Sequence, residues 1–149
     1  MVPMKIITVE MSRHLEERAN AGGLGFAQMM ENAGRGTARA IQQRTSLKGR
    51  QVLVLVGPGN NGGDGLVAAH YLQEMDAGVT CYLWKRKLAD DPNYERVMQD
   101  GIPVLRSGKD PGYAGLRALV SGADVIVDAL LGVGVTRPIG GTLKDLLEA

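Results

Sequence analysis

Asn60, Asn61 and Asp64 stand in a glycine-rich segment, 57–65, and are the first residues of the chain whose types suggest ligand chemistry. Their amide and carboxylate oxygens can coordinate a hard cation, and the glycines leave backbone N–H groups open to a phosphate. The alternative is a tight turn in which glycine accepts a positive φ and Asp64 caps a helix. We favour a ligand site, because the segment holds more glycine and amide than a turn requires.

The same segment satisfies the Gly57-x-Gly59-x-x-Gly62 pattern of dinucleotide-binding proteins, which is a weak signal by itself. In those proteins an acid about 20 residues further on binds a ribose hydroxyl at the end of the second strand. Here that strand, expected at 79–84, runs into a Lys-Arg-Lys triplet at 85–87, so an ordinary NAD-binding oxidoreductase is disfavoured. We interpret the triplet as a solvated strand end, with a phosphate contact as the alternative. No Gly-Lys-Ser/Thr ending is present, which excludes a P-loop.

A further candidate is Asp128, which follows the apolar run 125–127 and precedes a second glycine-rich segment at 132–134. In open α/β sheets, ligands bind beyond the carboxyl ends of the strands, so an acid here favours a functional role over a turn or cap. Together with the polar side chains at 60–64, Asp128 would supply hard oxygen ligands. Such a set suits an alkali or alkaline-earth cation better than zinc.

Strand and helix patterns alternate along the chain. Short apolar runs predict buried strands at 51–56, 79–84, 102–105 and 125–127. Amphipathic patterns predict helices at 9–22, 26–44, 63–76, 92–99 and 111–121, and another from about 142. This alternation predicts an α/β fold, a Rossmann-like three-layer α/β/α sandwich with a mostly parallel sheet. In that fold the two glycine-rich segments meet at the carboxyl edge of the sheet, and Pro103 indicates an edge strand.

Two residues of the helix predicted at 26–44 bear on packing and function. Gly34 costs about 1 kcal/mol relative to Ala in a helix interior, which indicates close approach by another backbone. Asn32 has two interpretations, a polar anchor that faces the site or an exposed helix residue, and helical packing alone does not distinguish them. His14 and His70 have no Cys or His cluster nearby in sequence, so we expect no zinc site.

Bulk composition narrows the classes of function. The 149 residues suffice for one domain, and a net charge of +1 gives no nucleic-acid footprint. The single cysteine, Cys81, excludes an internal disulfide and is expected to be a buried hydrophobe. Neither a signal-peptide pattern nor an apolar run of membrane-spanning length is visible, so we expect a cytoplasmic protein with no membrane partner.

Three motifs in this order resemble the NAD(P)H-hydrate epimerase family, the YjeF N-terminal domain. They are Met-Glu-Asn-Ala-Gly at 30–34, Gly-Pro-Gly-Asn-Asn-Gly-Gly-Asp-Gly at 57–65 and Asp-Ala-Leu-Leu-Gly-Val-Gly-Val-Thr-Arg-Pro at 128–138. Their spread over nearly the whole chain makes the resemblance far more specific than the glycine fingerprint. It implies an isomerase that interconverts the R and S forms of hydrated NADH or NADPH, which are damaged cofactors with a hydroxyl at C6 of the nicotinamide ring.

The resemblance also implies roles for individual residues. Substrate contacts in the first segment would be Asn60, Asn61, Gly62, Gly63 and Asp64. Substrate phosphates would be held in the second segment by Gly132, Val133, Gly134, Val135, Thr136, Arg137 and Pro138. One potassium ion per subunit would be bound by Asn61 and Asp128. The implied partners are a second copy of the chain, as a homodimer, and an NAD(P)H-hydrate dehydratase, either fused or separate.

The chain departs from the family pattern after Pro138. Family members continue with a Ser-x-Asp-x-Pro-Ser-Gly stretch that supplies another carboxylate and a potassium-binding hydroxyl. We therefore expect residues 1–149 to form a single YjeF N-terminal-type domain that lacks the family's C-terminal part, and we expect this chain alone not to be a competent epimerase. Epimerisation needs a general acid/base, and Asp64 and Asp128 both remain candidates. The alternative function is a non-catalytic binding or dimerisation scaffold. In such a scaffold we would expect the glycine and Asn/Asp motifs to be altered, whereas they are intact in this sequence.

Overall fold

The computed structural model describes residues 6–149, and residues 1–5 of the predicted domain lie outside the described range. Four strands form one parallel sheet in the order β3-β2-β1-β4. Each strand is a short apolar run, as predicted, and the bounds are β1 (Gln51–Val56), β2 (Gly78–Leu83), β3 (Val104–Arg106) and β4 (Val125–Ala129). β3 is an edge strand, as Pro103 indicated, and the prediction of a mostly parallel sheet is confirmed.

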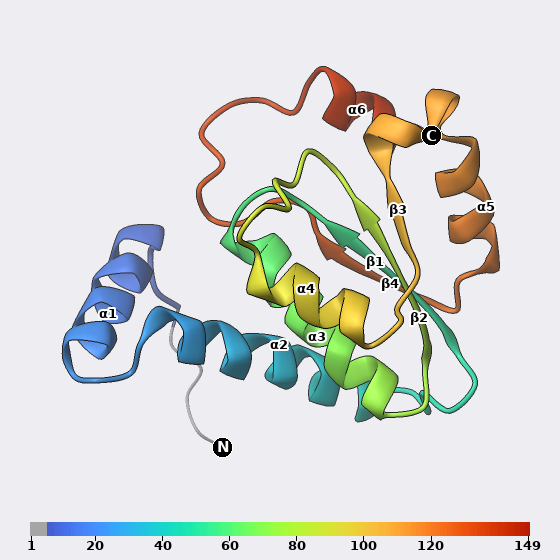
Figure 1. Ribbon diagram of the computed structural model, residues 1–149. Coiled ribbons are helices and arrows are strands. Elements are labelled where there is room, and N and C mark those ends of the chain that lie inside the picture. Colours follow the sequence, from blue (N-terminus) through green and yellow to red (C-terminus); the bar gives the residue numbers. More distant parts are fainter. Residues whose placement is uncertain (1–5) are drawn as a thin grey trace.

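Helices cover both faces of the sheet and produce the three predicted layers (Figure 1). On one face lie α2 (Phe26–Gln42), α3 (Asn60–Glu74) and α4 (Pro92–Gln99), which pack on a core that includes Val54 and Cys81. On the other lie α5 (Ala114–Gly122) and α6 (Thr142–Leu147), which pack on Leu53, Leu55 and Tyr82. The period-2 alternation of strand side chains therefore feeds two separate cores. No helix in residues 6–149 has the length and apolarity needed to cross a bilayer.

Gly34 lets α2 pack closely on α3. A Cβ at position 34 would lie 2.5 Å from the Cβ of Val67 and 2.8 Å from the backbone nitrogen of Ala68, which is inside van der Waals contact. The predicted close approach is thus confirmed. The neighbouring Glu31 links the same helix to α4, because it accepts two hydrogen bonds from the Arg96 guanidinium, at 2.8 and 3.0 Å.

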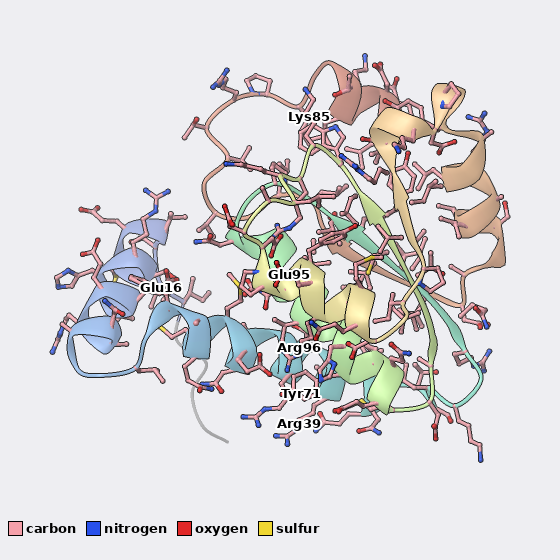
Figure 2. All side chains as sticks on the ribbon, viewed as in Figure 1. Glu16, Arg39, Tyr71, Lys85, Glu95 and Arg96 are labelled. Atoms are coloured by element: carbon pink, nitrogen blue, oxygen red, sulfur yellow. The ribbon has the colours of Figure 1, made fainter. Side chains whose placement is uncertain are left out.

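The link between α2, α3 and α4 also includes Tyr71, whose hydroxyl donates to Glu31. Figure 2 labels Tyr71 and Arg96, and the guanidinium carbon lies 5.7 Å from the centroid of the tyrosine ring. Asn32 accepts hydrogen bonds from Gln28 and Arg35 of its own helix and is exposed, which settles its two interpretations in favour of an exposed helix residue.

Asp110 fixes the start of α5 and joins it to β2. Its carboxylate accepts hydrogen bonds from the N–H groups of Gly115 and Leu116, at 2.9 and 3.0 Å, and from the Tyr82 hydroxyl at 3.1 Å. The hydrogen bond from Gly115, with those from Leu116 and Tyr82, holds the pKa of Asp110 below its ordinary value. Burial, with the hydrogen bond to Asp110, raises the pKa of Tyr82.

α1 (Val9–Ala21) stands apart from the sheet, and a short loop connects it to the start of α2 (Figure 1). Thr8 begins the helix by accepting a hydrogen bond from the N–H of Met11 at 3.2 Å, and Gly22 ends it, as predicted. None of the residues of α1 is buried, and Met11 and Leu15 are 52% and 50% exposed. Its apolar stripe therefore has no partner among residues 6–149.

Two of the element bounds that differ from prediction lie next to candidate residues. α3 begins at Asn60 rather than 63, and its N-cap is Gly59, so Asp64 does not cap this helix. β4 ends at Ala129 rather than 127, because the parallel ladder with β1 continues through the pairs Leu55–Asp128 and Val56–Ala129, and Asp128 lies near the carboxyl end of the strand, as predicted. Pattern reading placed both boundaries at a change of composition, whereas backbone hydrogen bonding sets them.

Candidate functional site

A cavity of about 1210 Å³ lies beyond the carboxyl ends of the strands. Pro58, Trp84 and Leu130, which follow β1, β2 and β4, form part of its wall. Met30 of α2 and Glu16 of α1 also line it. Parallel strands present their carboxyl ends at one edge of the sheet, so the topology itself gathers these distant segments around a single hollow.

Most of the predicted substrate contacts line this cavity. They are Asn60, Asn61 and Asp64 from the start of α3, and the whole run from Gly132 to Pro138 from the loop between β4 and α6. Gly62 and Gly63 are buried in the first turn of α3 and are not among the lining residues. Only their backbone could reach a ligand, and substrate binding by these positions stays a prediction.

The glycines at 57, 62 and 63 have packing roles that the ligand hypothesis did not include. A Cβ at Gly57 would lie 1.8 Å from the carbonyl oxygen of Leu130, and one at Gly62 would lie 2.1 Å from the carbonyl oxygen of Gly57. A Cβ at Gly63 would meet the sulfur of Met30 at 2.6 Å. The glycine density of the first segment therefore follows from backbone crowding as well as from any ligand.

Asn61 joins the two glycine-rich segments directly. Its Nδ2 donates a hydrogen bond to the carbonyl oxygen of Leu131 at 2.8 Å. A Cβ on Gly132 would lie only 3.1 Å from the Cβ of Asn61, so the second segment passes close against the start of α3. The meeting of the two segments, which the predicted fold required, is confirmed.

Asp64 is a half-buried carboxylate on the cavity wall. Burial raises its pKa from 3.8 to about 6, and the negative charge of Glu16 contributes in the same direction. Glu16, labelled on α1 in Figure 2, lines the same cavity. A carboxyl group that titrates near 6 can both donate and accept a proton close to neutral pH.

Asp128 has a different environment. It is exposed on β4, and its Oδ1 accepts a hydrogen bond from the N–H of Leu130 at 2.9 Å. It is not among the residues that line the cavity, whereas Asn61, the other predicted potassium ligand, is. Among residues 6–149, Oδ2 of Asp128 and Oδ1 of Asn61 accept no hydrogen bond, so both atoms are available to a cation.

The donor set at this edge of the sheet is chemically narrow. Residues 6–149 contain no group of three or more His, Cys, Asp or Glu side chains that could hold a metal ion. A cation near Asn61 and Asp128 would therefore depend on amide, carbonyl and single carboxylate oxygens. Such ligands suit an alkali or alkaline-earth cation, and the binding of a cation here stays a prediction.

The interpretation of the 85–87 triplet as a solvated strand end is wrong for Arg86. Its side chain is only 10% exposed, and its Nε donates to Oδ2 of Asp91 at 2.6 Å. Its Nη1 donates to the carbonyl oxygens of Gly57 and Gly59, at 2.9 and 3.0 Å. Lys85 and Lys87 are exposed, as expected. The sequence does not distinguish the three adjacent basic residues. Arg86 is buried because Asp91 and the carbonyls of Gly57 and Gly59 lie against its guanidinium.

Comparison with known proteins assigns the family. Residues 26–149 match the family described as the YjeF-related protein N-terminus. The chain belongs to this family. Its fold agrees with the crystal structure of yeast ynu0, YNL200c, with a TM-score of 0.81 at 27% identity, over 97% of this chain and 64% of the yeast chain.

Curated proteins similar to this YjeF-family chain carry repair and epimerase names. The bifunctional NAD(P)H-hydrate repair enzyme Nnr of Thermofilum pendens is 40% identical over 98% of this chain and 28% of its own length. The NAD(P)H-hydrate epimerase of Rhodobacter capsulatus is 36% identical, over 92% of this chain and 66% of its own length. The NAD(P)H-hydrate epimerase of Yarrowia lipolytica is 45% identical, over 97% of this chain and 59% of its own length. The chain thus spans between 28% and 66% of the length of these three relatives.

Proposed function

We propose that this YjeF-type domain serves an NAD(P)H-hydrate epimerase, which interconverts the R and S forms of hydrated NADH and NADPH when the protein is expressed from its full reading frame. The observation that carries the proposal is the convergence of both glycine-rich segments on one cavity at the carboxyl edge of the sheet. Its volume, about 1210 Å³, is sufficient for a dinucleotide-sized ligand. Two relatives named NAD(P)H-hydrate epimerase, 36% and 45% identical, support the same activity.

Substrate binding is proposed to use both segments. The N–H groups of Asn60, Asn61 and Gly62 precede the first backbone hydrogen bond of α3, from the Gly63 N–H to the Gly59 carbonyl, and an anion is stabilised at such a helix N-terminus. The exposed loop 132–138, with the Arg137 guanidinium, offers a second place for phosphate. One potassium ion per subunit is proposed at Asn61 and Asp128, where it would supply positive charge next to an anionic substrate.

The proposed chemistry needs one proton donor that can also act as an acceptor. The protonated carboxyl group gives its proton to the C6 hydroxyl, the ring nitrogen donates its electron pair, and water leaves to produce an iminium ion. Water then adds to C6 from the other face, its proton returns to the carboxylate, and the ring nitrogen recovers its electron pair. No oxidant or reductant is consumed. We propose Asp64 for this role because it lines the cavity and has a pKa of about 6, whereas Asp128 does not line the cavity.

The decisive experiment follows the conversion of (R)-NADPH hydrate to the S form by chromatography, using protein expressed from the full reading frame. The natural protein is expected to reach the equilibrium mixture in minutes. Asp64→Asn is expected to lower kcat by about 10²- to 10⁴-fold, the usual contribution of a general acid/base. A non-catalytic scaffold would give no conversion above the spontaneous rate, and a fully active Asp64→Asn variant would reject the assigned role of Asp64.

The potassium proposal is tested separately. Replacing potassium by choline is expected to weaken substrate binding by the natural protein, and Asp128→Ala is expected to abolish the difference between the two buffers. Equal binding by both proteins in both buffers would reject the cation site. Because Asp128 is exposed, this substitution leaves the core unchanged.

The remaining partner assignments are also proposals. We propose a homodimer in which the apolar residues of α1 contact the second copy, since none of them is buried in one subunit. We also propose that a dehydratase for the same hydrates is fused to the domain or acts beside it, because relatives at 40% and 36% identity are named bifunctional repair enzymes. A cytoplasmic location, where the pools of reduced cofactor turn over, completes the proposal.

A further inference from the structure

The Arg86 guanidinium lies where β2, the first glycine-rich segment and α4 meet. The guanidinium donates three hydrogen bonds. One goes to the Asp91 carboxylate at 2.6 Å, and two go to the carbonyl oxygens of Gly57 and Gly59 at 2.9 and 3.0 Å. Gly57 and Gly59 immediately precede α3, which begins at Asn60. One side chain therefore fixes both peptide groups that lead from the central strand into the candidate site.

The charge of this cluster is balanced within the protein. Arg86 and Asp91 are 10% and 9% exposed, so neither charge is well solvated. A guanidinium beside the N-terminus of α3 would be opposed by the helix dipole, and the Asp91 carboxylate compensates. Asp91 is itself held in place, because its Oδ1 accepts a hydrogen bond from the N–H of Tyr94 as the N-cap of α4. The Arg86–Asp91 pair therefore contacts the N-terminal ends of both α3 and α4.

The contacts have a directional consequence for the cavity. The described peptide bonds are all trans, and in a trans peptide the C=O and the following N–H point in opposite directions. Because the Gly59 carbonyl points to Arg86, the N–H of Asn60 points away from it, as the first N–H group of the helix. Asn60 and Asn61 line the cavity in this arrangement. The Gly59 carbonyl also accepts the N–H of Gly63 at 3.3 Å, whereas the Gly57 carbonyl has Arg86 as its hydrogen-bond donor, so loss of the guanidinium would release the Gly57 carbonyl and weaken the hold on that of Gly59.

We propose that Arg86, held by Asp91, is a positioning residue that keeps segment 57–60 in the geometry in which the first turn of α3 faces the substrate. The inference rests on the proposed function, because the substrate is the one proposed for this cavity. Arg86 acts through Asn60 and Asn61 rather than on the reacting atoms. Packing supports this role, since a Cβ on Gly62 would lie 2.8 Å from Nη1 of Arg86, so the guanidinium lies directly against the turn that it positions.

A smaller hollow makes the inference testable by chemical rescue. It has a volume of about 290 Å³ and is lined by Arg86, Asp91 and Asn60, among other residues. Truncation of Arg86 to alanine would enlarge this hollow and remove the guanidinium hydrogen bonds to Oδ2 of Asp91 and to the carbonyls of Gly57 and Gly59. A free guanidinium ion has the same donors and can enter from solvent. Rescue by guanidinium would separate positioning from a general loss of folding.

The experiment compares Arg86→Ala with Arg50→Gln in protein expressed from the full reading frame. Arg50 pairs with Asp124 at 3.0 Å at the opposite end of β1, so its variant is a control for the loss of an arginine ion pair. Arg86→Ala is expected to lower kcat/KM for NADPH hydrate by about 10- to 100-fold, the effect of misplaced substrate contacts. Millimolar guanidinium chloride is expected to recover most of that loss, and Arg50→Gln is expected to keep the natural value with or without it.

Hydrogen exchange of the amides at 59–62 supplies a readout that does not require epimerase activity. Exchange there is expected to accelerate in Arg86→Ala and to slow again with guanidinium, while β1 stays protected. Unchanged exchange, or faster exchange with an unchanged kcat/KM, would overturn the positioning role. If the natural protein converts no hydrate, the proposed function fails, and the exchange data alone decide whether Arg86 fixes the segment.

Discussion

Asp64 and Asp128 are both carboxylates at the carboxyl edge of the sheet, yet their surroundings give them different chemistry. Asp64 is half-buried on the wall of the cavity and faces the charge of Glu16, and its pKa rises to about 6. Asp128 is exposed and keeps one oxygen available. This difference in burial and position is the reason that proton transfer is proposed for Asp64 and cation binding for Asp128.

The raised pKa of Asp64 predicts a pH dependence of stability. The unfolded chain loses this proton near pH 4, while the folded protein keeps it up to about pH 6. The contribution of Asp64 to the free energy of unfolding therefore falls as pH rises from 4 to 6 and stays low above that. We expect a loss on the order of 1 kcal/mol, reduced by solvent screening of this half-buried group.

Urea unfolding at pH 4.5 and pH 7 measures this effect. Asp64→Asn is expected to remove this part of the pH dependence and to be more stable than the natural protein at pH 7. Glu17→Gln, an exposed carboxyl on α1, is a matched control that should leave the pH dependence unchanged. A natural protein and an Asp64→Asn variant with identical pH profiles would contradict the assigned pKa.

At the scale of elements, α2 and α3 are joined by a contact that only glycine permits. Gly34→Ala is expected to lower the free energy of unfolding by about 1–3 kcal/mol, because the new methyl group would overlap Val67 and the backbone of Ala68. Gly36→Ala on the same helix is the control, since a Cβ there meets no atom within 4 Å. It is expected to stabilise by about 0.5–1 kcal/mol through helix propensity. Equal effects of the two substitutions in urea unfolding would refute the packing explanation.

Asp110, at the start of α5, is expected to affect the stability of the protein in acid. Hydrogen bonds lower the pKa of Asp110, so its contribution to stability is complete above the ordinary carboxyl pKa and is lost as pH falls through the lowered value. Asp110→Asn is expected to be less stable than the natural protein at pH 7 and to show a shallower loss of stability below pH 4. Tyr82→Phe removes only one of three hydrogen bonds and should have an intermediate effect in thermal unfolding measured across pH 2 to 7.

At the scale of the whole molecule, α1 is the element that one subunit leaves without a packing partner. We expect sedimentation to show a dimer for the natural protein, and Leu15→Glu on the exposed apolar stripe to shift it towards the monomer. Arg18→Glu on the same helix also changes charge but removes no apolar surface, and it should leave the dimer intact. A monomeric natural protein, or a dimer unaffected by Leu15→Glu, would exclude α1 as the interface.

Much of this molecule follows from local sequence alone. The alternation of apolar runs with amphipathic segments determined the parallel sheet and its layers, because periods of 2 and 3.6 residues decide which side chains can be buried. Two single residues were also informative. Gly34 permits the close contact between α2 and α3, and Pro103 lacks the N–H that an interior strand would need. The three motifs, at 30–34, 57–65 and 128–138, were sufficient to indicate the family that the comparison then assigned.

Only the tertiary structure decided how the candidate residues are used. It placed Asn60 on a helix, through the hydrogen bond from the Gly63 N–H to the Gly59 carbonyl, and it extended β4 past Val127 because β1 supplies a distant backbone partner. It also distinguished Arg86 from its two lysine neighbours, since burial depends on Asp91 and on the carbonyls that fold back against it. A sequence records residue types in order, whereas charge, pKa and hydrogen-bond direction depend on neighbours that only the folded chain brings together.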